Sequence, residues 1–479
     1  MIWTLHDVLT ATGGTMINDA DGASPINGID FDSRKIAPND LFLAFKGAHS
    51  DGHDYLNAAH EGGALAAIVD HEVDSAITQI IVSDVHQALW GMARSARART
   101  EASIIAITGS VGKTGTRDLM ASCLAGMGKT HATAGNYNNQ IGAPLSLARM
   151  PIEAEYGVFE LGMDHAGEIA ELSPLVLPDI AVITKIAESH IGYFDSLEGI
   201  ARAKAEIFDG LKPDGLVLLN ADDDFTPLLT RLAREKGAGR VMTIGTHGDA
   251  DARIDQIDHR EAGYEVTALI AGQKITFTLG MSAVHWIHSA LMSLAAVHYL
   301  GGDIHEAAAQ LADHKEMDGR GARHQLKIND RSITLIDDSY NASPASMAAG
   351  IANLGMSNIT AKGRKIAVLA DMLELGDAAE HYHRALATDL ATADIDILIC
   401  FGPLMAGLAD AASQPDQHTL QIHHCADADS ALEIILSIAD DGDVVLVKGS
   451  NGMKAHHIAK ALTSRNQNAH SHKGDPHAA

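Results

Sequence analysis

The stretch IIAITGSVGKTGT, residues 104–116, decides the fold. An apolar run ends at Thr108, and two glycines and a Lys–Thr pair follow it. We expect a buried strand, a tight turn and a helix from about Thr116, whose free amides and dipole favour an anion. The usual nucleotide loop reads G-x-x-x-x-G-K-[ST], whereas only Ser110 and Val111 separate the glycines here. The sequence therefore predicts a phosphate-binding loop of a shortened kind.

Two side chains of this loop carry the expected chemistry. Lys113 can reach the β- and γ-phosphates of ATP, and the Thr114 hydroxyl can ligate Mg²⁺. A glycine-rich turn with an incidental lysine is the alternative interpretation. The residues predicted to bind ATP here are Gly109, Ser110, Val111, Gly112, Lys113, Thr114 and Gly115.

Similar apolar runs recur along the chain and alternate with alanine-rich helical stretches. Runs that are apolar on both faces are typical of buried parallel strands in α/β units, where ligands bind beyond the carboxyl ends of the strands. The runs are SIIAITGS, YGVFELG, IAVITKI, GLVLLNADD, SITLIDDSY, KIAVLADM, DILICFG and VVLVKGS.

A chain of 479 residues is too long for one ordinary core, and its pattern changes twice. We expect a small α/β domain at 1–100, a central α/β domain at 101–316, and four further strand–helix units at 317–463. The segment 464–479 is almost without apolar residues and is predicted to be a disordered tail.

Composition excludes several classes of function. With 62 acidic against 35 basic residues and a formal charge of −27, the chain lacks the basic footprint of a nucleic-acid-binding protein. No apolar run reaches the roughly 18 residues of a membrane span, and MIWTLHDVLT has no basic signal region. Three widely spaced cysteines fit a reduced compartment. We therefore expect a cytoplasmic protein without nucleic-acid partners or membrane insertion.

One lysine falls on the apolar face of a predicted helix. In DSLEGIARAKAEIF, residues 195–208, Lys204 shares its face with Ile200 and Ile207, and Asp195 with Glu198 resembles a capping box. A snorkelling lysine or a buried ion pair is the commoner explanation. A desolvated amine is, however, pushed toward its neutral form, which is nucleophilic and can take up CO₂.

Several blocks carry a family resemblance that runs from about residue 28 to 460. They are GNYNNQIGAPLSL (135–147), FELGMDHAGEIA (159–170), AESHIGYFDSLEGIARAKAEIF (187–208), DDSYNASPASM (337–347), LADMLELG (369–376) and VLVKGSNGMK (445–454). With the shortened G-x-x-G-K-T loop, these blocks resemble the Mur ligases, the ATP-dependent amide-forming enzymes of peptidoglycan precursor synthesis. DDSYNASP and DMLELG are similar to the branch that adds D-alanyl-D-alanine to UDP-N-acetylmuramoyl-tripeptide. The D-Y-A-H-type block of the ligase that adds the third residue is absent.

The resemblance implies a three-domain fold with a UDP-substrate-binding domain, a central ATP-binding domain with a mostly parallel sheet, and a C-terminal Rossmann-like domain. It also implies ATP and Mg²⁺, with two metal sites and a carbamylated Lys204. The implied metal ligands are Thr114, Glu160, His190 and Lys204, and the implied catalytic residues are Lys113, Lys204, His190 and Glu160. Without the resemblance, Glu160 and His190 are ordinary strand-end or structural polar residues.

Further residues are expected to contact the substrates. Ser33, Arg34 and Lys46 lie in a segment similar to the family's uridine-binding segment, although a solvent-facing charge cluster explains Lys46 almost as well. Other implied substrate contacts are Asn138, Asn139, Lys448, Gly449 and Ser450. Further ATP contacts are Ser289, Arg320, Asp337, Tyr340 and Asn341. Two positions depart from the family pattern. The family usually has an asparagine near Ser289, where it helps to hold adenine. It also usually has an asparagine at the position of Ser343.

The implied reaction joins a carboxylate to an amine through an acyl phosphate, with UDP-N-acetylmuramoyl-tripeptide and D-alanyl-D-alanine as substrates and the enzyme as a monomer. Two alternatives stay open. One is another ligase of the superfamily that adds a single amino acid, and the other is a nucleotide-binding scaffold that no longer turns over.

Overall fold

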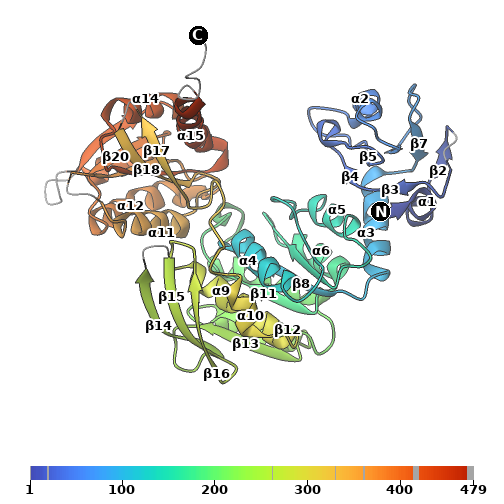
Figure 1. Ribbon diagram of the computed structural model, residues 1–479, viewed down its shortest axis with the longest axis horizontal. Coiled ribbons are helices and arrows are strands. Elements are labelled where there is room, and N and C mark those ends of the chain that lie inside the picture. Colours follow the sequence, from blue (N-terminus) through green and yellow to red (C-terminus); the bar gives the residue numbers. More distant parts are fainter. Residues whose placement is uncertain are drawn as a thin grey trace, which may run out of the picture.

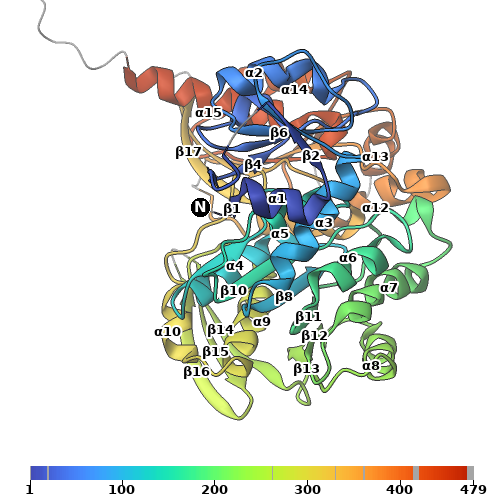
Figure 2. The same cartoon turned by 90° about the vertical axis from the view of Figure 1, so that its right-hand side faces the viewer.

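A computed structural model describes residues 2–18, 21–260, 263–328, 331–359, 362–413 and 420–471. The chain forms three lobes, each built on a main β-sheet of its own. In Figure 1 the N-terminal lobe (blue) and the C-terminal lobe (orange) lie above the central lobe (cyan to yellow). Figure 2 shows the same arrangement from the side of the N-terminal lobe.

The N-terminal lobe has a five-stranded sheet in the order β2-β7-β6-β5-β4, in which only β2 is antiparallel to its neighbour. A short pair, β1 (Trp3–Thr4) and β3 (Pro25–Ile26), lies beside it. The sheet strands are β2 (Thr15–Ile17), β4 (Ile29–Asp30), β5 (Leu41–Leu43), β6 (Ala66–Val69) and β7 (Thr78–Ile81). The helices are α1 (Leu5–Thr12), η1 (Ser33–Lys35), η2 (Gly52–Tyr55), α2 (Leu56–Glu61) and α3 (Val85–Ala98).

The central lobe has a nine-stranded sheet in the order β16-β15-β14-β13-β12-β11-β8-β10-β9. It is parallel from β9 to β14, and β15 and β16 add an antiparallel meander at the edge. The strands are β8 (Ser103–Thr108), β9 (Thr130–Ala132), β10 (Tyr156–Glu160), β11 (Ile180–Ile183), β12 (Leu216–Asn220), β13 (Arg240–Gly245), β14 (Ala252–Arg260), β15 (Gly263–Ile270) and β16 (Gln273–Leu279). The helices are α4 (Lys113–Ala125), α5 (Gly142–Ala148), α6 (Glu168–Val176), η3 (Ile191–Tyr193), α7 (Leu197–Ala205), η4 (Glu206–Gly210), α8 (Thr226–Glu235), α9 (Trp286–Tyr299) and α10 (Ile304–Ala309).

The C-terminal lobe has a six-stranded sheet in the order β17-β18-β22-β19-β20-β21, parallel except for β17. Its strands are β17 (Ala322–Ile328), β18 (Arg331–Asp338), β19 (Lys365–Ala370), β20 (Ile397–Phe401), β21 (Gln421–Cys425) and β22 (Val444–Lys448). Its helices are α11 (Pro344–Gly355), η5 (Gly376–Ala378), α12 (Ala379–Thr392), α13 (Met405–Ala412), α14 (Ala428–Ile438), η6 (Asn451–Met453) and α15 (Ala455–Ser471).

All eight apolar runs form parallel strands, so the predicted α/β class is confirmed. The number of strand–helix units in the C-terminal lobe was wrong, because β21 with α14 adds a fifth. Strand β21 was missed because it is the edge strand QIHHC, which is polar and largely accessible to solvent.

Two further details differ from the predictions. Helix α4 begins at Lys113 instead of Thr116, and α7 is capped by Ser196, which accepts from the Gly199 amide, instead of by Asp195. Helix α15 continues to Ser471, into the segment predicted as a tail, and 472–479 lie outside the described residues. The domain boundaries themselves stay predictions. No helix in the described part of the chain has the length and apolar character needed to cross a membrane.

Candidate active site

The phosphate loop connects β8 to α4, and hydrogen bonds to Thr184 and Lys185, which follow β11, hold its backbone in place. The Ser110 amide donates to the Lys185 carbonyl at 2.7 Å, and the Thr184 hydroxyl donates to the Val111 carbonyl at 2.6 Å. Gly109 has a φ of 153°, and a Cβ there would lie 1.9 Å from the Thr184 Oγ1. The loop therefore holds one backbone shape, and Gly112 ends it as the N-cap of α4.

Lys113 is folded back over the loop. Its Nζ donates to the Gly109 carbonyl at 2.7 Å. Desolvation lowers the pKa of Lys113, while the charge of Glu160 opposes that shift. The amine is thus held where an incoming phosphate would be its preferred partner.

Glu160 ends β10 and is 1 % exposed. The Thr114 hydroxyl donates to its Oε2 at 2.9 Å, and the Asn138 amide donates to its Oε1 at 2.7 Å. Arg117 approaches the same Oε2 at 3.5 Å. A buried carboxylate beside a hydroxyl at the end of a parallel strand offers the hard oxygen ligands that Mg²⁺ requires.

Lys204 lies on the buried face of α7 and is 2 % exposed, as its helical position predicted. Burial is the main cause that lowers the pKa of Lys204 well below its usual range, and the nearby charge of Lys113 adds to the effect, while Asp164 opposes it. Within the described residues, no carboxylate lies at ion-pair distance from its amine. The described residues therefore do not supply the buried ion pair considered from the sequence.

His190 stands where the central and C-terminal lobes meet. Its Nδ1 lies 2.5 Å from Glu374 Oε2, which belongs to the C-terminal lobe, and 3.3 Å from Asp164 Oδ1. A backbone hydrogen bond also links the two lobes here, because the Gly192 amide donates to the Glu374 carbonyl at 2.9 Å. Asp164, His190 and Glu374 place one ligand atom each within 4.8 Å of one another.

The C-terminal lobe contributes several charged and polar groups. The Arg320 guanidinium lies 4.0 Å from the centre of the Tyr340 ring. Lys448, at the end of β22, pairs with Asp338 at 2.8 Å and donates to the Asn341 carbonyl at 3.0 Å. This lobe therefore presents two fixed cations to the phosphate loop.

A cavity of about 630 Å³ lies between the central and the C-terminal lobe and is lined by residues of both. Fourteen predicted site residues line it: Ser110, Val111, Gly112, Lys113, Thr114, Gly115, Asn138, Glu160, His190, Ser289, Arg320, Tyr340, Asn341 and Lys448. The other predicted residues are not among its lining residues: Gly109, Asn139, Lys204, Asp337, Gly449, Ser450, Ser33, Arg34 and Lys46.

Three of the residues outside the lining have partners of their own. Asn139 Oδ1 accepts from the Gly142 amide at the start of α5, at 2.9 Å. Asp337 accepts from the Ser339 hydroxyl at 2.5 Å, and Ser450 accepts from the Leu373 amide at 2.9 Å. In this geometry these side chains hold backbone in place beside the cavity.

The predicted uridine segment lies on the N-terminal lobe. Ser33 and Arg34 belong to η1, after β4, and Lys46 follows β5. The Arg34 side chain is 86 % exposed and pairs with Asp32 at 2.8 Å. Lys46 is also exposed. Both cations are thus accessible to a ligand.

Many of the residues that line the cavity were not selected from the sequence, among them the polar and aromatic residues Asp164, Trp286, Asp338 and Asn353. Asp164 and Asp338 stand in quoted blocks beside residues that were chosen. Trp286 packs where a Cβ on Gly115 would meet its ring at 1.7 Å, and its buried Nε1 has no hydrogen-bond partner in the described parts of the chain. Glu374 was also missed, although it stands in the block DMLELG.

The residues present fit a divalent cation of the magnesium class. Thr114 and Glu160 offer adjacent hydroxyl and carboxylate oxygens, and Asp164, His190 and Glu374 form a second group of donors nearby in the cavity region.

Comparisons with known proteins agree with this geometry. Three family models match the chain: "Mur ligase family, catalytic domain" at residues 25–97, "Mur ligase middle domain" at 107–297, and "Mur ligase, glutamate ligase domain" at 322–451. The UDP-N-acetylmuramoyl-tripeptide–D-alanyl-D-alanine ligase of Bacillus subtilis is 34% identical over 96% of this chain and 98% of its own. The ligase of the same name from Escherichia coli is 32% identical over 91% and 94%.

A solved structure is similar over the same extent. The crystal structure of MurF from Acinetobacter baumannii has a TM-score of 0.82, is 29% identical, and is matched over 96% of this chain and 99% of its own. The three-lobe fold is thus shared along nearly the full length of both chains. The chain belongs to the Mur ligase family.

Proposed function

We propose that this chain is an ATP-dependent ligase that adds D-alanyl-D-alanine to UDP-N-acetylmuramoyl-tripeptide in peptidoglycan precursor synthesis. The observation that carries the proposal is the cavity in which the phosphate loop, Glu160 and His190 of the central lobe face Arg320, Asn341 and Lys448 of the C-terminal lobe. Relatives that match this chain over nearly its full length are named for this activity.

The chemistry has two steps. A carboxylate oxygen of the tripeptide attacks the γ-phosphorus of ATP, which forms an acyl phosphate and releases ADP. The neutral amine of D-alanyl-D-alanine then attacks the acyl carbon, loses a proton, and expels phosphate. A carboxylate alone is a poor acyl donor because oxide is a poor leaving group, and phosphorylation removes that obstacle.

Positioning and charge stabilisation are the main work of the protein in phosphoryl transfer. The loop amides and Lys113 hold the β- and γ-phosphates, and Arg320 and Lys448 bring positive charge from the opposite lobe. Lys448 is fixed by Asp338 and the Asn341 carbonyl, and we propose that Gly449 and Ser450 support its position near the incoming dipeptide.

Thr114, Glu160, His190 and a carbamylated Lys204 would hold Mg²⁺, which supplies neutralisation of the phosphate charge when bound. The buried amine of Lys204, which has no ion-pair partner among the described residues, supports this role because desolvation lowers its pKa and so favours the neutral, nucleophilic form that takes up CO₂.

The remaining contacts divide between the lobes. We propose that Ser289 lies near adenine, where its hydroxyl already accepts from Thr116 at 2.8 Å, so that base recognition relies on neighbours such as Trp286. Asn341 and Tyr340 would contact ATP from the other side. Ser33, Arg34 and Lys46 would bind the UDP moiety on the N-terminal lobe. We further propose a monomer that works in the cytoplasm.

The decisive experiment measures phosphate release with each substrate left out in turn. We expect turnover to require ATP, UDP-N-acetylmuramoyl-tripeptide and D-alanyl-D-alanine together. Single amino acids in place of the dipeptide test the rival ligase reaction, and phosphate release with one of them alone would favour it. Nucleotide binding without turnover under every combination would favour the silent scaffold.

A further inference from the structure

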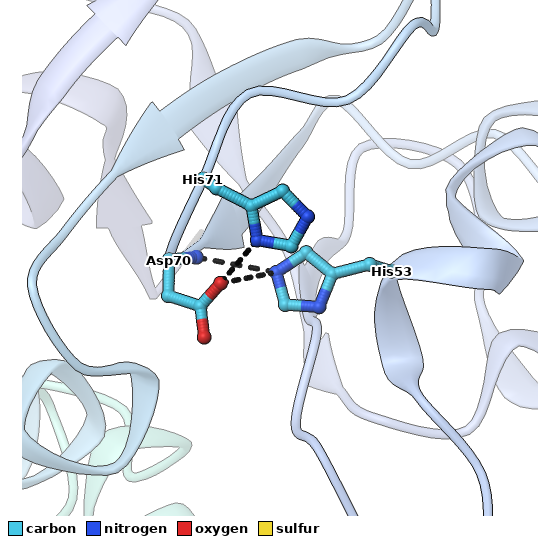
Figure 3. Close-up of side chains that lie close together, drawn as sticks. All are labelled: His53, Asp70 and His71. Carbon is cyan, nitrogen blue, oxygen red and sulfur yellow. Dashed lines mark hydrogen bonds and ion pairs between the residues drawn. The ribbon is translucent and has the colours of Figure 1, made fainter.

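Two histidines and an aspartate meet on the N-terminal lobe, and none of them lines the nucleotide cavity. His53 belongs to η2, and Asp70 and His71 come directly after β6. Figure 3 shows one carboxylate oxygen of Asp70 between ring nitrogens of the two histidines. The carboxyl end of a parallel strand is where sheets of this class present functional groups.

The distances are those of a compact donor set. Asp70 Oδ1 lies 2.5 Å from His71 Nδ1 and 3.2 Å from His53 Nε2. The two imidazole rings stack with their centres 4.3 Å apart. All three donor atoms lie within 4.8 Å of one another.

A fourth residue sets the tautomer of His53. Its Nδ1 lies 2.6 Å from Asp51 Oδ1, and the same carboxylate oxygen accepts from the His53 amide at 3.0 Å, so the ring nitrogen is the donor in this contact. The proton of a neutral His53 is therefore on Nδ1, and the lone pair of Nε2 points toward Asp70. Metal-binding histidines show this pattern, because their second ring nitrogen usually donates to a carboxylate.

In this arrangement two hydrogen-bond acceptors, His53 Nε2 and Asp70 Oδ1, face each other. Nε2 of His53 receives one long hydrogen bond, from the Asp70 amide at 3.2 Å, and faces Asp70 Oδ1 at the same distance. A lone pair facing a carboxylate oxygen is unfavourable unless a cation or a second ring proton lies between them. His53 is buried while Asp70 and His71 are accessible, so an ion can reach the site from solvent.

We propose that His53 Nε2, Asp70 Oδ1 and His71 Nδ1 bind a divalent transition-metal ion of the zinc class. Two imidazoles and one carboxylate suit Zn²⁺, Ni²⁺ or Cu²⁺ and disfavour Mg²⁺, which prefers oxygen. On binding, the proton of His71 moves to Nε2 and the His71–Asp70 contact opens to about 3.3 Å, the spacing of two ligands on a tetrahedral ion. Water takes the fourth position.

The ion ties two separate segments together. His53 follows the turn in which Lys46 pairs through its backbone with Asp51, and Asp70 and His71 end β6. A bound ion therefore crosslinks the loop after β5 to the end of the neighbouring strand, and it raises the melting temperature of the full chain by binding only the folded form.

Zinc binding to the full-length protein tests the site. Metal content after dialysis and titration calorimetry with ZnCl₂ are compared for the wild type, His71→Ala, Asp70→Asn and the control His60→Ala. His60 is exposed on α2 and is not one of the proposed ligands. We expect His71→Ala and Asp70→Asn to lose one zinc ion per chain, with at least about 100-fold weaker binding, while His60→Ala matches the wild type.

The two ligand variants replace accessible side chains, so they avoid disturbing the buried His53. His470, His472 and His477 near the C-terminus are present in every variant, and any zinc that they hold cancels in the comparison. Asp51→Asn keeps all three ligands and should weaken binding about 10–100-fold. Equal zinc content and affinity in the wild type, His71→Ala and Asp70→Asn would overturn the proposal.

Crystals soaked in ZnCl₂ locate the ion independently of ligase activity. We expect an anomalous peak at the zinc edge between the rings of His53 and His71. Peaks elsewhere, such as at Asp164, His190 and Glu374, with none here, would assign the cluster to a hydrogen-bonded imidazolium instead. Because neither readout uses turnover, a failure here leaves the proposed ligase reaction untouched, and the reverse also holds.

Discussion

The phosphate loop and the uridine segment are both predicted to bind a nucleotide, yet they are built differently. Around the phosphate loop, Lys113, Thr114 and Glu160 each have a fixed partner inside the protein. In the uridine segment, the Arg34 side chain is 86 % exposed and pairs with its near neighbour Asp32. One region is organised before the ligand arrives, and the other presents side chains that a ligand can still order.

This difference matches two separate tasks. Charge stabilisation in a transition state is effective only when the groups are already in place, because reorganising them would cost part of the gain. Ground-state binding of a nucleotide tolerates side chains that become ordered on binding, at the cost of their conformational entropy. Substitutions in the first region should therefore lower turnover, and substitutions in the second should raise the Michaelis constant.

The largest effect is expected from Lys113→Ala. The change removes a charge-assisted contact to the transferring phosphoryl group, and turnover should fall by roughly 10³-fold or more. Steady-state phosphate release with saturating substrates measures the effect, and Lys236→Ala, which removes a surface pair with Asp209, is the matched control.

Circular dichroism of the Lys113→Ala variant checks that the fold is kept. Near-normal turnover in a folded variant would mean that this loop is not the phosphate site, and the contrast between the two regions would lose its basis.

The next effect concerns the chemical state of Lys204. Lys204→Ala should lower turnover by roughly 10²-fold or more, and small carboxylic acids in solution should restore part of it by standing in for the carbamate. Lys204→Arg should stay inactive because an always-protonated guanidinium cannot take up CO₂. Lys204→Glu should retain a little activity, since it supplies a carboxylate with a shorter reach.

Lys204→Met separates packing from chemistry, because it keeps the buried volume and removes the amine. Carbon-13 NMR with labelled bicarbonate should show a carbamate signal in the wild type with Mg²⁺ and nucleotide, and none in Lys204→Met. A fully active Lys204→Arg variant would contradict the carbamate.

Much of the fold followed from pattern alone. The apolar runs that became β8, β10, β11 and β12 are short and buried on both faces, as is typical of strands in a parallel sheet. Strand β21 escaped notice because an edge strand needs apolar residues on only part of its surface. The buried face of α7 was predictable, since period and burial are linked in a helix.

The site was less predictable where it depends on contacts between lobes. Glu374 reaches His190 across 184 positions of sequence, and no local pattern indicates that contact. Asp337 was preferred to Asp338, yet alternation along β18 turns Asp338 toward the cavity and Asp337 toward Ser339. A resemblance identifies a block, whereas the choice between neighbours needs the direction of each side chain.

The smallest effect is expected from Arg34→Ala, and it tests the other half of the comparison. Because Arg34 is exposed and its guanidinium pairs with the neighbouring Asp32, its loss should leave the fold and the phosphate loop unchanged. Losing one charge-assisted hydrogen bond to a phosphate should raise the Michaelis constant for the UDP-precursor by about 10-fold or more. The Michaelis constant for ATP should change little, since ATP binds in the cavity between the other two lobes. Initial rates with each substrate varied in turn measure both constants, and Arg231→Ala, which replaces another exposed arginine, on α8, is the control. If both constants rose together, the two regions would share one ligand, and the division of labour between a fixed loop and an adaptable segment would be wrong.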